Sequence, residues 1–193
     1  AEVLKQTMQD KLWDADAEFF KTLRDERAKG NYGNTKTEEC EPGQLVKVRE
    51  LYGYAPWYFN MPDEGKGYEM AWAQLTDPQG FKGEYGPGFA ERRHPNFEIK
   101  PRGCWWAGNS WPLTTSQTLT ALANLLNYYE QDVIGKQEYF DTLRGYTRSH
   151  QHRLQDGTVV PWIDENLNQD TGRWALNGSF PKTNGRYYNH SSY

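Results

Sequence analysis

The chain has 193 residues, of which 36% are hydrophobic and 15% aromatic. It is long enough to bury one substantial core and too rich in aromatic residues for a disordered segment. Its 26 acidic and 22 basic residues are interspersed and give a net charge of -4, without the basic stripe that a phosphate backbone requires. No stretch of the sequence is apolar enough for a transmembrane helix. We therefore expect one folded unit with neither a nucleic acid nor a membrane as partner.

The first hundred residues predict short helices joined by long loops. Residues 2–13 are typical of a helix and residues 18–23 of a short strand, and residues 46–58 and 68–75 are two further possible helices. Residues 81–101 are rich in glycine, proline and charge and exceed the length of a simple connection. We expect them to form a structured loop, a kind of segment that often carries function.

Two longer helices are predicted next. Apolar residues recur at three- and four-residue steps from Pro112 to Gln131, and proline suits the first turn of a helix. Ser110 is predicted to cap this helix. A second helix is predicted over residues 136–154, and the short turn between the two favours an antiparallel hairpin. The sequence therefore predicts a mainly α chain built from paired antiparallel helices with long structured loops.

Three tryptophans lie just before the first of the two long predicted helices. Indole faces stack well on the C–H side of a pyranose ring, so Trp105, Trp106 and Trp111 are candidates for a sugar site. Between them, Gly108 permits close approach of a ligand, and Asn109 can donate to and accept from sugar hydroxyls. The alternative is that these tryptophans anchor the core ahead of the helix, and we expect this of at least one of the three.

A second group of aromatic and acidic residues follows downstream. Trp162 precedes Asp164 and Glu165, and Glu165 leads a polar loop that ends at residues 171–172, a Thr-Gly pair. A carboxylate beside indole rings can be partly desolvated and positioned as a general base. We predict Glu165 as the catalytic residue and Asp164 as the runner-up. Neighbouring side chains of an extended segment face opposite ways, so we expect only one of the two to point into a cleft. The alternative for either is an ordinary loop carboxylate.

Two other segments offer residues for a binding cleft. Tyr54 and Trp57 belong to a run of aromatics so dense that we expect some of them to line a cleft, with packing in the core as the alternative. A charged run in the predicted long loop could grip a sugar or tie the loop to the domain by ion pairs. This run consists of Glu91, Arg92, Arg93 and His94.

Other chemistries find no support in the sequence. The histidines and the two cysteines lack metal-ligand spacing, so no metal and no cofactor are predicted. Cys40 and Cys104 could form at most one disulfide, and their spacing leaves open whether they meet. The nucleophile elbow and the P-loop are both absent. A carbohydrate is therefore the expected ligand. The chain could be an enzyme acting on it or a binding protein with an aromatic cleft, and a third possibility is an interaction fragment completed by another polypeptide.

Seven short motifs follow one another along the chain. They are Leu12-Trp13-Asp14 with Phe19-Phe20, Tyr54-Ala55-Pro56-Trp57, residues 86–95, residues 106–112, Ser116-Gln117-Thr118-Leu119, residues 165–172 and Tyr188-Asn189-His190-Ser191. In this order they resemble the six-hairpin glycosidases, specifically the mannosylglycerate hydrolase-like and glucosidase group related to glycoside hydrolase family 63. The resemblance implies a portion of an (α/α)6 toroid with its site where the long loops gather, and inverting hydrolysis by two carboxylates.

The resemblance also implies roles for single residues. In such enzymes a glutamate ahead of a Thr-Gly pair is the general base, which implies this role for Glu165, and Trp106, Gly108 and Trp111 would line the sugar site. The charged loop 91–94 would border the cleft. The family's general acid lies ahead of the Leu-Trp-Asp motif, so we expect it outside this chain.

A complete toroid also has more helices than this sequence predicts. We therefore expect residues 1–193 to form a single partial catalytic domain. The N-terminal and C-terminal portions of the toroid would lie outside these residues. We expect this remaining part of the domain to be a partner of the chain. The sugar, its anomer and its linkage are left open by the resemblance.

Overall fold

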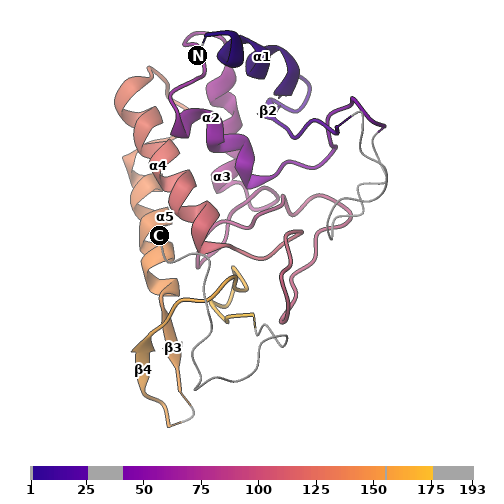
Figure 1. The fold of residues 1–193 in the computed structure, drawn as a ribbon. Coiled ribbons are helices and arrows are strands. Elements are labelled where there is room, and N and C mark those ends of the chain that lie inside the picture. The colour runs from indigo at the N-terminus through magenta and orange to yellow at the C-terminus, as the bar shows by residue number, and fades with distance from the viewer. Residues whose placement is uncertain (1, 26–40, 155, 176–193) are drawn as a thin grey trace.

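The computed structural model describes residues 2–25, 41–154 and 156–175. Helices dominate this part of the chain (Figure 1): α1 (Glu2–Leu12), the 3-10 turn η1 (Leu51–Tyr54), α2 (Ala55–Tyr58), the 3-10 turn η2 (Tyr68–Trp72), α3 (Ala73–Thr76), α4 (Pro112–Tyr128) and α5 (Lys136–Ser149). The strands are short and form two antiparallel pairs: β1 (Trp13–Asp14) with β2 (Phe19–Phe20), and β3 (Gln151–Arg153) with β4 (Val159–Pro161). The prediction of a mainly α chain is confirmed.

Helices α4 and α5 form the predicted hairpin and lie side by side in Figure 1. Pro112 occupies the first turn of α4, where its missing N–H costs no hydrogen bond. The prediction that Ser110 caps α4 is wrong. Trp111 occupies the N-cap position without a side-chain capping hydrogen bond, and the main chain of Ser110 pairs with Leu167. The Ser110 hydroxyl lies 3.5 Å from that of Thr115.

The second long helix is shorter than predicted. It ends at Ser149, and strand β3 begins at Gln151 and pairs with β4, where a helix to residue 154 was expected. Gly157 takes a positive φ of 88° at the turn, and Asp156 accepts the N–H of Thr158 at 2.8 Å. An Asp-Gly pair beside the β-branched Val159 is a hairpin signal, and here cross-strand pairing outweighs the helical period.

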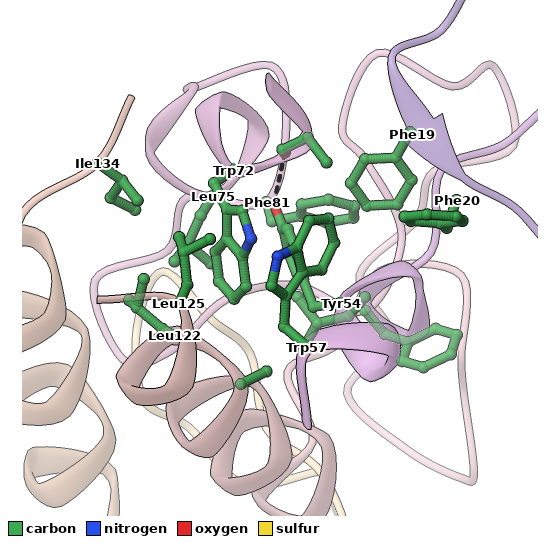
Figure 2. Close-up of a cluster of buried hydrophobic side chains, with 14 of the residues drawn as sticks. Phe19, Phe20, Tyr54, Trp57, Trp72, Leu75, Phe81, Leu122, Leu125 and Ile134 are labelled. Atoms are coloured by element: carbon green, nitrogen blue, oxygen red, sulfur yellow. Dashed lines mark hydrogen bonds between the residues drawn. The ribbon is translucent and has the colours of Figure 1, made fainter. Parts of the chain in front are cut away.

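A cluster of large aromatic rings forms the core between η1, α2, η2 and α4 (Figure 2). The ring of Tyr54 stacks on that of Trp72 with centroids 4.1 Å apart, and Trp57 meets Trp72 edge-on at 5.5 Å. Gly53 makes this packing possible, since a Cβ atom there would come within 2.1 Å of the Phe19 ring. Burial of these rings is what fixes the loops around α4.

One buried hydrogen bond in this core gives a testable prediction. The Tyr54 hydroxyl donates to the carbonyl of Ala71 at 3.1 Å. Tyr54→Phe removes the donor and leaves that carbonyl short of a partner, so we expect the free energy of unfolding to fall by about 1 kcal/mol. Denaturant unfolding of the full-length protein measures it, with the exposed Tyr58→Phe as control. Equal midpoints for the two variants would show that the bond contributes nothing.

Candidate active site

The tryptophan segment and the acidic segment meet in the structure although they are far apart in the sequence. Ser110 and Leu167 exchange two backbone hydrogen bonds, each of 2.9 Å. Leu167 also forms a bridge to Trp174 on its other side. Glu165 therefore lies in a segment held between two neighbouring stretches of chain, one of which carries the predicted sugar-stacking indoles.

Trp106 and Trp111 stack face to face, with ring centroids 3.8 Å apart and an angle of 13°. Trp111 is 3% exposed, and its indole N–H donates to the Trp105 carbonyl at 3.0 Å. Trp106 is half-buried and donates to the sulfur of Cys104 at 3.2 Å. The ammonium of Lys100 lies over the ring of Trp105, 3.4 Å from its centroid. Trp111 is thus the tryptophan that packs in the core, as expected of at least one of the three. Trp106 keeps part of its ring exposed and bonds Cys104.

Asn109 and Asn166 form a buried pair of amides beside this stack. Asn109 donates to the Asn166 side-chain oxygen at 2.5 Å and to the Lys100 carbonyl at 2.8 Å, and it accepts the Lys100 N–H at 2.9 Å. Asn166 donates to the carbonyl of Gly103 at 3.1 Å. Asn109 was predicted to reach sugar hydroxyls, but it is 0% exposed and its polar atoms are engaged within the chain. Sequence patterns contain no signal for Asn166, because its partners lie about sixty residues away, beyond the reach of local patterns.

The two candidate carboxylates are both largely buried. Asp164 is 1% exposed, and one of its oxygens accepts the N–H of Glu165 at 2.8 Å. Its other oxygen has no hydrogen-bond partner within the described residues. Burial raises the pKa of Asp164, an effect that the bond from the Glu165 N–H opposes and the charge of Glu165 reinforces. Glu165 is 9% exposed, and it lies close enough to Cys104 for its charge to raise the pKa of that thiol.

Cys104 therefore connects the Glu165 carboxylate with the Trp106 indole. Burial raises the pKa of this thiol above its usual value, the bond from Trp106 lowers it, and the charge of Glu165 raises it again. A thiol whose pKa is raised stays protonated near neutral pH and can donate to a carboxylate. Sequence analysis assigned Cys104 no role beyond a possible disulfide, and its position beside Glu165 is a finding of the structure.

The raised pKa of Asp164 predicts a pH-dependent stability. Since the folded state holds the Asp164 proton more tightly than the unfolded state, the free energy of unfolding falls as pH rises between the two pKa values. Asp164→Asn removes this titration, so the variant should gain thermal stability over the parent at neutral pH, with the difference shrinking toward about pH 4. Melting temperatures at a series of pH values measure it. A constant difference at every pH, or an equal effect of the exposed Asp132→Asn, would contradict the prediction.

Gly108 is required by the packing of the chain itself. A Cβ atom at this position would lie 2.2 Å from the carbonyl oxygen of Glu98. The carbonyl of Gly108 receives the side-chain amide of the fully buried Gln169, whose oxygen accepts from Arg92 at 2.7 Å. Gly108 was predicted to permit close approach of a ligand. In the structure, its missing side chain permits close approach of the backbone of Glu98.

The predicted long loop contains a buried ion pair. Glu91 is 3% exposed and accepts both the main-chain N–H of Arg49, at 2.9 Å, and its guanidinium, at 2.7 Å. Arg93 approaches the same carboxylate at 3.6 Å. A carboxylate that is buried and bonded in this way holds the loop to the segment before η1.

The other charged residues of the loop are also engaged within the chain. Arg92 forms an ion pair with Asp170, and Arg93 forms one with Asp77. The ring nitrogen of His94 accepts the N–H of Asn96, two residues along, at 3.2 Å. These contacts agree with the second of the two interpretations of this charged run, in which its ion pairs tie the loop to the domain. Arg92 and Asp170 link it directly to the segment that carries Glu165.

The remaining predicted cleft residues lie elsewhere. Tyr54 and Trp57 are each 1% exposed in the aromatic core of Figure 2, so they are core residues and the prediction that they line a cleft is wrong. Phe19, Phe20 and Trp72 supply ring contacts that the local sequence could not show. Trp162 is half-buried at the base of the β3–β4 hairpin, 5.2 Å from the His152 ring between centroids.

Two features of the sequence lie outside the described residues, namely Cys40 and the motif Tyr188-Asn189-His190-Ser191. Within the described ranges, three or more His, Cys, Asp or Glu side chains do not gather as a metal site would need. The helices that the structure describes are all too short or too polar to cross a membrane.

Paired helices with aromatic and acidic side chains gathered in the loops beside them are characteristic of the helical toroid class of carbohydrate-active enzymes. The chain belongs to the MGH1-like glycoside hydrolase family: the family model described as "Mannosylglycerate hydrolase MGH1-like glycoside hydrolase domain" matches residues 1–191. No curated protein sequence matches the chain.

Solved structures show the same relationship. One named "Sialidase" is 39% identical, with a TM-score of 0.75 over 92% of this chain and 14% of that chain. The GH63 mannosylglycerate hydrolase from Thermus thermophilus in complex with glucose is 16% identical, with a TM-score of 0.58 over 90% of this chain and 34% of that chain. An uncharacterized conserved protein from the same organism is 17% identical, with a TM-score of 0.55 over 89% and 34%.

The predicted resemblance to the group related to glycoside hydrolase family 63 is confirmed by these matches. The fold is mainly helical and is a portion of an (α/α)6 toroid. The chain spans only about a third of the mannosylglycerate hydrolase chain and about a seventh of the sialidase-named chain.

Proposed function

We propose that residues 1–193 supply the general base and part of the sugar-binding wall of an inverting glycosidase. The observation that carries the proposal is that paired backbone hydrogen bonds of Ser110 and Leu167 hold the segment of Glu165 beside the indole stack. Trp106 of that stack bonds Cys104, whose pKa is raised by the charge of Glu165. A carboxylate next to an exposed indole face is the arrangement that a pyranose substrate needs. Family membership supports the same class of reaction.

In this proposal Glu165 takes a proton from a water molecule, and the oxygen of that water attacks the anomeric carbon. The glycosidic bond breaks as a second carboxylic acid protonates the leaving oxygen. An inverting pair stands about 6.5–9.5 Å apart to admit the water, and we propose that the acid lies outside residues 1–193. Asp164 accepts the main-chain N–H of Glu165 and so helps to orient it. Asp164 stays the alternative base.

Neutral hexosides, as oligosaccharides or small glycosides, are the substrates we propose. The solved GH63 mannosylglycerate hydrolase was obtained with glucose bound, which supports a neutral sugar here. Of the cations beside the site, Arg92 and Arg93 already pair with Asp170 and Asp77. They would border the cleft without contributing free positive charge for an acidic sugar.

The other portions of the toroid are the partner that we propose for this chain. Large apolar side chains are exposed at one end of the described structure, including Leu4 on α1, which is 66% exposed, and Phe59 after α2, which is 67% exposed. Both border an apolar groove that also contains Met8 and Met61. Exposed apolar surface of this kind marks an interface, and we propose that further helices of the same catalytic domain cover it.

Hydrolysis and simple binding are distinguished by one experiment. The full-length protein is incubated with a panel of neutral glycosides, and proton NMR follows both sugar release and the anomer formed first. We expect release of a sugar whose first-formed anomer is opposite to that of the substrate. Release with retained configuration would refute the inverting mechanism. Micromolar to millimolar glycan binding without release, unchanged by Glu165→Gln, would identify a carbohydrate-binding protein instead.

A further inference from the structure

The buried amide pair formed by Asn109 and Asn166 connects three parts of the site. Asn109 is 0% exposed and Asn166 is 1% exposed. Buried amides are costly unless their donors and acceptors are bonded. Asn109 uses both of its N–H groups and its oxygen, toward Asn166 and Lys100, and Asn166 donates to Gly103. Such a hydrogen-bonded network has one favoured geometry, which an apolar contact would not impose.

Each member of the pair adjoins a residue of the proposed site. Asn166 follows Glu165 directly, and the Gly103 carbonyl that it holds precedes Cys104, whose thiol pKa is raised by the charge of Glu165. Asn109 lies in the short segment that links Trp106 to α4, and it holds the main chain of Lys100 at both its N–H and its carbonyl. Backbone bonds of the neighbouring residues, Ser110 with Leu167, continue the same connection.

We infer that the Asn109–Asn166 pair positions Glu165 against the Cys104–Trp106 side of the site, so that both asparagines are positioning residues for hydrolysis. This inference rests on the proposed role of Glu165. Breaking the pair frees the loop of residues 98–106 and the segment of residues 164–167 to move independently. A displacement of about 1 Å of a catalytic group can cost on the order of 10²-fold in rate.

Hydrogen exchange tests the coupling without any assay of activity. Asn166→Ala in the full-length protein is expected to speed amide exchange in residues 98–106, where the Lys100 N–H is bonded to Asn109. Asn109→Ala should speed exchange in both 98–106 and 164–167. The control is Asn127→Ala, which should leave both segments unchanged, because the Asn127 amide bonds the Ala123 carbonyl within α4. Unaltered exchange of residues 98–106 in Asn166→Ala would overturn the inference.

A second variant covers the case in which Asn166→Ala does not fold. Asn166→Asp has the same shape and still accepts from Asn109, but it can no longer donate to the Gly103 carbonyl. It is expected to speed exchange at residues 102–106 while the amide of Lys100 keeps its protection. Protection lost equally at all these positions, or at none, would contradict separate roles for the two bonds.

Kinetics of the full-length protein then separates positioning from mere stability. Asn166→Ala is expected to lower kcat on the order of 10²-fold, with KM within about threefold of the parent, because the substrate contacts are retained while the base is displaced. An unchanged kcat beside a strong effect of Glu165→Gln would overturn the positioning role and leave the proposed function intact. Faster exchange in Asn166→Ala with full activity in Glu165→Gln would overturn the role of Glu165 and, with it, the positioning role.

Discussion

Glu165→Gln in the full-length protein is expected to lower kcat by about 10²- to 10⁴-fold, the range that a positioned general base contributes. Glutamine keeps the shape of the side chain, but it cannot take a proton from water. KM should change little, because the sugar contacts lie elsewhere, at Trp106 in our proposal. Initial rates of sugar release, with melting temperatures to confirm folding, measure the effect.

The matched control for this substitution is Asp164→Asn, which alters the adjacent carboxylate with the same change of one atom. It should reduce kcat by about tenfold or less, because in our proposal Asp164 orients Glu165 through its N–H and takes no proton from water. The reverse order, with Glu165→Gln within about tenfold of the parent and Asp164→Asn inactive, would identify Asp164 as the base.

Trp57→Ala is expected to lower the free energy of unfolding by about 3–5 kcal/mol, as is usual for deletion of a large aromatic side chain from a core. Trp57 is 1% exposed, meets the rings of Phe20 and Trp72 edge-on, and its carbonyl accepts the side-chain amide of Asn124 on α4 at 2.9 Å. Guanidinium chloride unfolding measures the change.

The control is Phe140→Ala, an aromatic that is 54% exposed on α5 and contacts Arg144 across its ring. It should cost about 1 kcal/mol or less. Weakened sugar binding with unchanged stability in Trp57→Ala would instead indicate that Trp57 lines the cleft, and would contradict its place in the core.

Much of the fold could be predicted because its strongest signals are local. The apolar period and proline of α4 predicted that helix within three residues at its C-terminal end. The end of α5 was missed because a helical period and a hairpin turn compete over residues 150–161, and pairing between strands decides the outcome. Tyr54 and Trp57 show the same limit. Dense aromatics indicate burial or binding equally, and the choice depends on distant partners such as Phe19 and Trp72.

The candidate site was predicted in part for the same reason. Glu165 and Trp106 stand in motifs that the sequence displays, and the structure brings their segments together. Asn166, Gln169 and Cys104 act through contacts with residues far away in the chain. Their roles follow from how the loops pack against each other, which no local pattern of residue types records.

A structure of the full-length protein with a bound monosaccharide tests the role of Glu165 most directly. We expect the sugar ring on the face of Trp106, with the Glu165 carboxylate in reach of a water molecule near the anomeric carbon. A second carboxylic acid, from outside residues 1–193, should stand about 6.5–9.5 Å from it across the sugar. A sugar bound away from Glu165 would contradict the account.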